Sequence, residues 1–124
     1  MLLRRLDHVS LNATDRPRSI TWYSHVLGLE QQSEPGSDDA PVFLGEKGAA
    51  IALFQAQTPA PPRDSETAGL RHVAFMVSAE DLRRFHIHLA EHGVDARYED
   101  HGNAHSLYLD DPDGNTIELT TYEV

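Results

Sequence analysis

Two segments of the chain alternate between apolar and polar residues in the way that predicts β-strands. In the segment 5–12, apolar residues such as Val9 point to one side and His8 points to the other. The segment 70–77 has the same pattern and carries His72 in the matching place. Each strand therefore has one apolar face and one polar face, and each polar face carries a histidine.

Two further segments have the apolar spacing of amphipathic helices. The first begins near Pro17, a residue that the first turn of a helix tolerates, and ends at Gly28. The second begins after Ser78, a capping residue, and ends at Gly93. Each predicted helix directly follows one of the two histidine-bearing strands.

Short strands fill the rest of each half. The expected strands are 30–33, 42–44 and 49–55 after the first helix, and 96–99, 106–110 and 116–122 after the second. A proline-containing linker, 56–68, separates the halves, and a polar loop covers 34–40. Each half thus reads strand, helix and three strands, which predicts an α+β fold made of two βαβββ modules.

The two halves also align residue by residue. The segment 6–9 matches 70–73 at an offset of 64, and 48–53 matches 114–119 at an offset of 66. Two modules related by a pseudo-twofold axis bring equivalent strands together near that axis. We therefore expect His8, His72 and Glu118 to converge, and the position equivalent to Glu118, Ala52, to supply no ligand.

Length and composition narrow the function further. The 124 residues fit a single domain, 1–124, with modules at about 5–56 and 69–123. A net charge of −10 argues against nucleic acid as a partner, because phosphate binding needs clustered Lys and Arg. No apolar run is long enough to span a bilayer, and the first residues lack the long apolar stretch of a signal peptide, so we expect a cytoplasmic protein without a membrane partner.

Two imidazoles and one carboxylate form the donor set of an open metal site. This facial arrangement of His8, His72 and Glu118 leaves positions for water or substrate. It suits Fe²⁺ best, and Mn²⁺, Ni²⁺, Zn²⁺ or Co²⁺ as alternatives. A single strand histidine is more often a packed or surface residue. The hypothesis therefore depends on three side chains at equivalent positions on one face.

Candidate catalytic residues lie near Glu118. Tyr108 is ten residues earlier, across a predicted hairpin and on the same face, where its phenol could bind a substrate oxygen or act as an acid. The alternative is a packed tyrosine at the edge of a cavity. His101 and His105 precede this strand; we take His105 as a candidate acid or base, against the alternative of exposed loop histidines.

Several motifs together resemble the vicinal oxygen chelate superfamily. They are Leu6-Asp7-His8-Val9, the helix end 22–29, Arg71-His72-Val73-Ala74-Phe75 and the segment 107–119, which contains Asp-Pro-Asp-Gly-Asn-Thr-Ile-Glu-Leu. The superfamily comprises glyoxalase I, extradiol dioxygenases, fosfomycin resistance proteins and bleomycin resistance proteins. The resemblance implies a half-open mixed β-barrel, a divalent metal held by His8, His72 and Glu118, a substrate-contacting Tyr108 and a homodimer.

Three functions remain open at this point. The leading hypothesis is a metal-dependent enzyme acting on a small substrate that chelates through adjacent oxygens. Within this hypothesis we favour a dioxygenase-like site over a lyase or isomerase, because Ala52 occupies the position at which glyoxalase I has a fourth metal ligand. The second is a protein of the bleomycin-resistance type that sequesters a drug or metabolite. The third is a degenerate subunit or sensor without activity.

Overall fold

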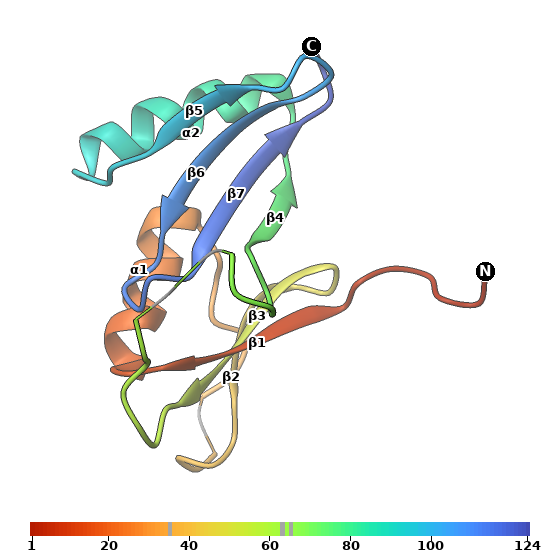
Figure 1. The fold of residues 1–124 in the computed structure, drawn as a ribbon. Coiled ribbons are helices and arrows are strands. Elements are labelled where there is room, and N and C mark those ends of the chain that lie inside the picture. The colour runs from red at the N-terminus through yellow and green to blue at the C-terminus, as the bar shows by residue number, and fades with distance from the viewer. Residues whose placement is uncertain (35, 63, 65) are drawn as a thin grey trace. The chain divides into compact units, whose positions relative to one another are not determined.

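The chain forms two compact units, 1–62 and 63–124. The computed structural model describes residues 1–34, 36–62, 64 and 66–124, so the expected loop 34–40 and linker 56–68 lie partly outside the described residues. Each unit has its own sheet and helix (Figure 1). Neither sheet closes on itself, and the expected α+β class is confirmed. The barrel that would unite the modules stays a prediction.

The first unit consists of a three-stranded sheet and one helix. Its elements are β1 (His8–Ala13), α1 (Arg16–Leu27), β2 (Val42–Glu46) and β3 (Ala49–Gln55). The strand order is β1-β3-β2, with β1 parallel and β2 antiparallel to the central β3. The side chain of Asp15 caps α1 by accepting a hydrogen bond from the Arg18 amide at 3.2 Å. Gly28 ends the helix at a φ of 72°, a conformation that favours glycine.

The second unit repeats this arrangement and adds one strand. Its elements are β4 (Val73–Met76), α2 (Ala79–Glu91), β5 (Arg97–Asp100), β6 (His105–Asp110) and β7 (Thr116–Thr121). The order is β4-β7-β6-β5, with β4 parallel to β7 and the other neighbours antiparallel. Ser78 caps α2 through the Asp81 amide at 3.0 Å, as expected. The carboxylate of Glu123 also accepts a hydrogen bond from the Ala79 amide at 2.8 Å.

Strand register confirms the internal repeat. Val9 pairs with Ile51 in the first unit, and Val73 pairs with Ile117 in the second. One residue further on, Ser10 pairs with Ala52 and Ala74 pairs with Glu118. Ala52 is therefore the structural equivalent of Glu118, as the alignment of the two halves predicts.

One predicted strand is wrong. The segment 30–33 forms only an isolated bridge, between Gln31 and Leu44, instead of a strand. Two backbone hydrogen bonds join the segment to β2, from the Gln32 amide to the Phe43 carbonyl and from the Gly45 amide to the Glu30 carbonyl, both at 2.8 Å. The side chains of Gln31 and Gln32 donate to the nearby carbonyls of Ser33 and Glu30 at 2.8 and 3.2 Å, so the backbone here is also bonded locally. The first unit therefore has two strands after its helix, whereas the second has three.

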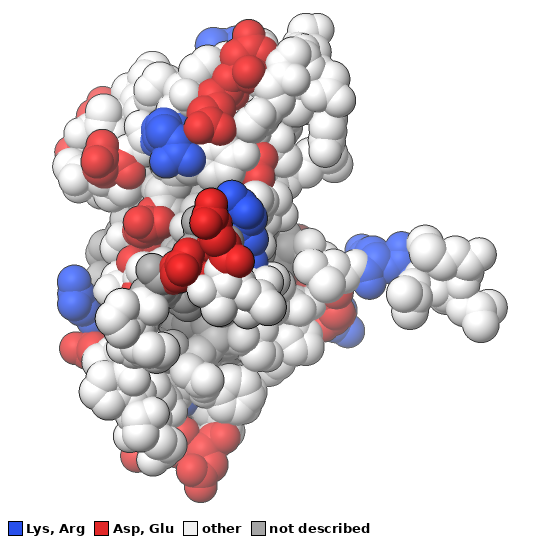
Figure 2. All heavy atoms as spheres, in the orientation of Figure 1, with Lys and Arg blue, Asp and Glu red and all other residues white. Residues whose placement is uncertain are grey.

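The apolar face of each sheet packs beneath its helix. Fully buried side chains come from β2 and β3 in one unit and from β6 and β7 in the other; they include Val42, Leu44, Ile51, Leu107 and Ile117. The net charge is −10, and Figure 2 shows acidic side chains spread over the face in view, with basic ones among them and on the N-terminal segment. Among the described residues, no helix is both long and apolar enough to cross a membrane.

Candidate functional site

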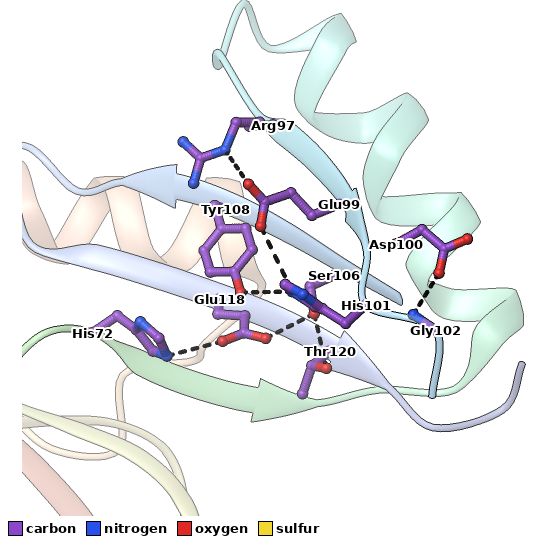
Figure 3. A network of polar contacts seen from close by, with 10 residues as sticks. All are labelled: His72, Arg97, Glu99, Asp100, His101, Gly102, Ser106, Tyr108, Glu118 and Thr120. Carbon is purple, nitrogen blue, oxygen red and sulfur yellow. Dashed lines mark hydrogen bonds and ion pairs between the residues drawn. The ribbon is translucent and has the colours of Figure 1, made fainter. Parts of the chain in front are cut away.

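A buried carboxylate lies at the centre of the four-stranded sheet. Glu118, in the middle of β7, is only 8 % exposed. Its Oε1 lies 2.9 Å from Nε2 of His72, which immediately precedes the neighbouring strand β4 (Figure 3). A carboxylate at this depth needs partners, because burial without them is costly. The expected association of His72 with Glu118 is thus present within the second unit.

Ser106 holds the other oxygen of this carboxylate. Its buried Oγ lies 2.7 Å from Glu118 Oε2 and 2.9 Å from Thr120 Oγ1. A serine hydroxyl has one hydrogen, and the carboxylate is the stronger acceptor, so Thr120 donates to Ser106 in turn. Because the three residues lie on adjacent strands, the sheet itself fixes the orientation of Glu118.

Tyr108 is directly opposite Glu118 in the ladder between β6 and β7. Its ring packs edge-on against the imidazole of His72, with 5.8 Å between centroids. Burial raises the pKa of Tyr108 above its ordinary value, and the charge and hydrogen bond of Glu118 raise it further. The phenol therefore stays protonated at neutral pH and can donate a hydrogen bond beside the carboxylate.

The two histidines before this tyrosine have different surroundings. Nε2 of His101 lies 3.0 Å from the Tyr108 hydroxyl and 3.7 Å from Glu99 Oε2 (Figure 3). His105 is the first residue of β6, an odd number of residues from Tyr108, and so faces the other side of the sheet. There it contacts the ring of Tyr98 and Asp100. The geometry favours His101 over His105 as the partner of Tyr108.

Arg97 and Glu99 complete the polar face on the edge strand β5. Arg97 Nε donates to Glu99 Oε1 at 2.9 Å, and the guanidinium carbon lies 5.0 Å from the centre of the Tyr108 ring. A cation over an aromatic face is attracted by the ring quadrupole. Arg97, Tyr108 and Glu118 therefore form one row across three adjacent strands.

His8, the third candidate ligand, begins β1 of the first unit. Its Nδ1 lies 2.7 Å from Asp7 Oδ2, and its ring packs edge-on against Phe43. The hydrogen bond from His8 lowers the pKa of Asp7, with smaller contributions from Lys47 and Arg5. A carboxylate that binds one ring nitrogen fixes the tautomer and leaves Nε2 available as a ligand atom.

The donor atoms fit a divalent ion. Two ligands bound at right angles and about 2.1 Å from an ion are about 3 Å apart. The 2.9 Å between His72 Nε2 and Glu118 Oε1 matches that separation. Within the described residues, no three His, Asp or Glu side chains gather into a ready-made metal-binding group. A site on this pair therefore needs a further donor.

The first unit also has an open pocket of about 610 Å³. It is lined by residues from the start of α1, the segment after it and the end of β3: Arg16, Pro17, Ile20, Gln31, Glu34, Asp38 and Gln55. The buried Arg16 donates to the Ala40 carbonyl at 2.6 Å. Its guanidinium thus fixes the chain around residue 40 to this unit.

Sequence reasoning missed Ser106 and Arg97. Ser106 is two residues before Tyr108, so strand alternation alone places it on the same face. Arg97 requires the pairing of β5 with β6, which its own segment does not specify. The alternation of side chains along β6 could therefore have identified Ser106. Identifying Arg97 requires knowing the register between β5 and β6.

The raised pKa of Tyr108 gives a first testable prediction. In metal-free protein, Glu118→Gln removes a negative charge beside the phenol, and we expect the pKa of Tyr108 to fall toward its ordinary value. Absorbance of tyrosinate during alkaline titration measures it, with Tyr108→Phe identifying the signal. Because the folded pKa is raised, the wild-type protein should lose stability as pH rises from the unfolded tyrosine's pKa through the folded one.

Glu80, an exposed residue in the first turn of α2, provides the control. Glu80→Gln changes the net charge equally but should leave the titration of Tyr108 unchanged. An unaltered Tyr108 titration in Glu118→Gln would contradict the assigned cause.

Comparison with known proteins gives consistent matches. The family model described as "Glyoxalase/Bleomycin resistance protein/Dioxygenase superfamily" matches residues 5–119. The chain is 36% identical over 120 residues to biphenyl-2,3-diol 1,2-dioxygenase 3 of Rhodococcus globerulus, covering 93% of this chain and 62% of that protein. It is 28% identical over 118 residues to glutathione transferase FosA of Serratia marcescens, covering 95% and 81%.

Solved structures show the same fold. A glyoxylase/bleomycin resistance protein/dioxygenase domain from Frankia sp. EAN1pec aligns with a TM-score of 0.81 and 25% identity. The alignment covers 97% of this chain and 93% of that domain.

Proposed function

Because the chain belongs to the glyoxalase/bleomycin resistance protein/dioxygenase superfamily, we propose that it is a metal-dependent enzyme whose small substrate binds through two neighbouring oxygen atoms. The observation that carries this proposal is the pair formed by the buried Glu118 and the half-buried His72. Superfamily members use divalent metals, and this pair presents two suitable donor atoms at a suitable separation.

We assign the ligands as His8, His72 and Glu118. Glu118 offers Oε1, since Ser106 holds Oε2, and His72 offers Nε2. His8 offers Nε2, since Asp7 holds Nδ1. Three protein ligands leave coordination positions for substrate, and Ala52 adds no fourth. The homodimer also stays a prediction.

The protein groups around Glu118 have distinct roles in this proposal. When bound, the divalent ion would supply Lewis acidity toward the oxygens of the substrate. Tyr108, kept protonated by its surroundings, donates a hydrogen bond to a substrate oxygen. His101 orients that phenol: with a hydrogen on its Nε2 it donates to the Tyr108 hydroxyl oxygen and lies 3.7 Å from Glu99. The phenol's own hydrogen, which faces Glu118 in the free protein, then turns to a substrate oxygen when the substrate binds.

Within this class we favour a dioxygenase-like site with Fe²⁺. The open donor set of two histidines and one carboxylate is the arrangement that suits Fe²⁺ and oxygen chemistry. The similarity to the Rhodococcus globerulus dioxygenase supports the same reaction class. A lyase or isomerase activity is the alternative within the family.

Metal analysis of protein purified without chelators is the direct test. We expect about one equivalent of a divalent ion, or uptake of one equivalent of Fe²⁺ during anaerobic titration. Oxygen consumption with catechol would then support the dioxygenase reaction. Less than about a tenth of an equivalent, with no uptake on titration, would overturn the proposal.

Thermal stabilisation separates catalysis from sequestration. A metal-dependent enzyme should be stabilised by catechol only when it is loaded with metal. Equal stabilisation of the metal-free protein would instead favour a binding protein of the bleomycin-resistance type.

A further inference from the structure

Arg97 lies where it could bind a charged group of the substrate. Within the four strands β4 to β7, all of which are described, it is the only Lys or Arg. It pairs with Tyr108, which pairs with Glu118, so all three side chains share one face of the sheet. Neighbouring strands are about 4.8 Å apart, which puts the backbone of Arg97 about 10 Å from that of Glu118. This is the length of a small molecule.

The guanidinium is held in one orientation. Its Nε donates to Glu99 Oε1 at 2.9 Å, and its central carbon lies over the ring of Tyr108, 5.0 Å from the ring centre. Figure 3 shows the two terminal nitrogens pointing away from Glu99, on the side of Tyr108. Among the described residues, no hydrogen bond or ion pair engages these two nitrogens. A guanidinium fixed at Nε presents a pair of parallel donors that matches a carboxylate.

Glu99 tethers Arg97 without occupying its outer edge. One oxygen of Glu99 binds Nε of Arg97, and the other lies 3.7 Å from His101. Both oxygens of Glu99 are thus directed to the protein, and Arg97 lies over the ring of Tyr108. Because the Arg97 side chain is 68% exposed, solvent screens its attraction for a bound anion. Its fixed orientation lowers the entropic cost of binding that anion.

We propose that Arg97 selects substrates that carry a carboxylate or similar anionic group at the end opposite the two chelating oxygens. This inference rests on the proposed function, because it takes the chelating end of the substrate to lie at Glu118 and His72. Tyr108 then contacts the middle of the molecule and Arg97 its far end. The substrate class is a small acid with neighbouring oxygens, such as an acidic catechol.

Equilibrium binding of two catechols to protein loaded with Fe²⁺ under anaerobic conditions tests this. Dihydroxyphenylpropionate carries the anion, and propylcatechol is its uncharged counterpart. We expect the anionic catechol to bind about three- to tenfold more tightly, the effect of an exposed but preorganised ion pair. In Arg97→Gln the ratio of the two dissociation constants should fall to about one, while affinity for propylcatechol is retained. Arg97→Lys should keep part of the preference.

Arg84 on α2 provides a matched control. It is 73% exposed and pairs with Glu80 at 3.1 Å, much as Arg97 pairs with Glu99. Arg84→Gln should leave the ratio unchanged, which excludes a general effect of net charge. Equal affinities for the two catechols in the wild-type protein, or an unchanged ratio in Arg97→Gln, would overturn the role proposed for Arg97. Neither result would contradict the proposed function. Failure of the loaded protein to bind propylcatechol would overturn the proposed function and this inference with it.

Discussion

Glu118→Gln should abolish stoichiometric metal binding while leaving the fold intact. The amide keeps the shape of the side chain, and its oxygen can still accept from Ser106 or His72. It lacks the negative charge that a divalent ion requires. We expect affinity to fall by more than about 100-fold, since even the loss of an outer hydrogen-bond partner costs 10- to 100-fold. Anaerobic titration with Fe²⁺ measures the affinity, and circular dichroism reports the fold.

Glu99→Gln is the control for this experiment. Glu99 is a carboxylate on the same face of the same sheet, but it belongs to the edge strand and binds Arg97 and His101. Its substitution should leave metal affinity within about threefold, because it removes charge without removing a ligand. Equal metal affinity in Glu118→Gln and the wild-type protein would remove Glu118 from the ligand set.

Leu107→Ala should lower the free energy of unfolding more than any other substitution proposed for this protein. Leu107 lies on β6, is fully buried and belongs to the apolar face beneath α2. Truncating a buried leucine removes apolar contacts and leaves a cavity, which costs about 2–5 kcal/mol. Urea denaturation at equilibrium should show a lower midpoint with a similar slope.

Leu70→Ala offers a comparison in the same unit. Leu70 is 66% exposed and precedes β4, so its truncation should change the free energy of unfolding by less than about 0.5 kcal/mol. Similar losses for the two variants would show that Leu107 is not part of a tightly packed core.

Local pattern and internal repetition predicted much of the fold. The cap at Ser78 and the glycine at the end of α1 are local signals, and the structure confirms them. The equivalence of Ala52 and Glu118 came from aligning the halves, and strand register confirms it. The segment 30–33 was predicted to be a strand, but it forms only a bridge at Gln31. The side chain of Gln31 bonds to nearby backbone, and such a bond leaves no trace in the apolar pattern of the sequence.

The surroundings of Glu118 were less predictable. The association of His72 with Glu118 followed from the repeat, but the contacts of Arg97 and His101 depend on side chains that meet across strands. Such contacts follow from register and from the conformation of the turn before β6, which the sequence pattern does not specify. Sequence reasoning therefore named the carboxylate and its histidine, but it chose His105, whereas the structure places His101 beside Tyr108.

The hydrogen bond from Ser106 restricts what Glu118 can do. With Oε2 occupied by a hydroxyl, Glu118 would bind the proposed ion through one oxygen, and rotation of the carboxylate to offer both oxygens would break a buried contact. A one-oxygen donor uses a single coordination position, so the remaining positions stay available for exchange. Ser106 thus restricts the rotation of the carboxylate, and in the proposed metal site this uncharged hydroxyl would determine how many coordination positions are left for a substrate.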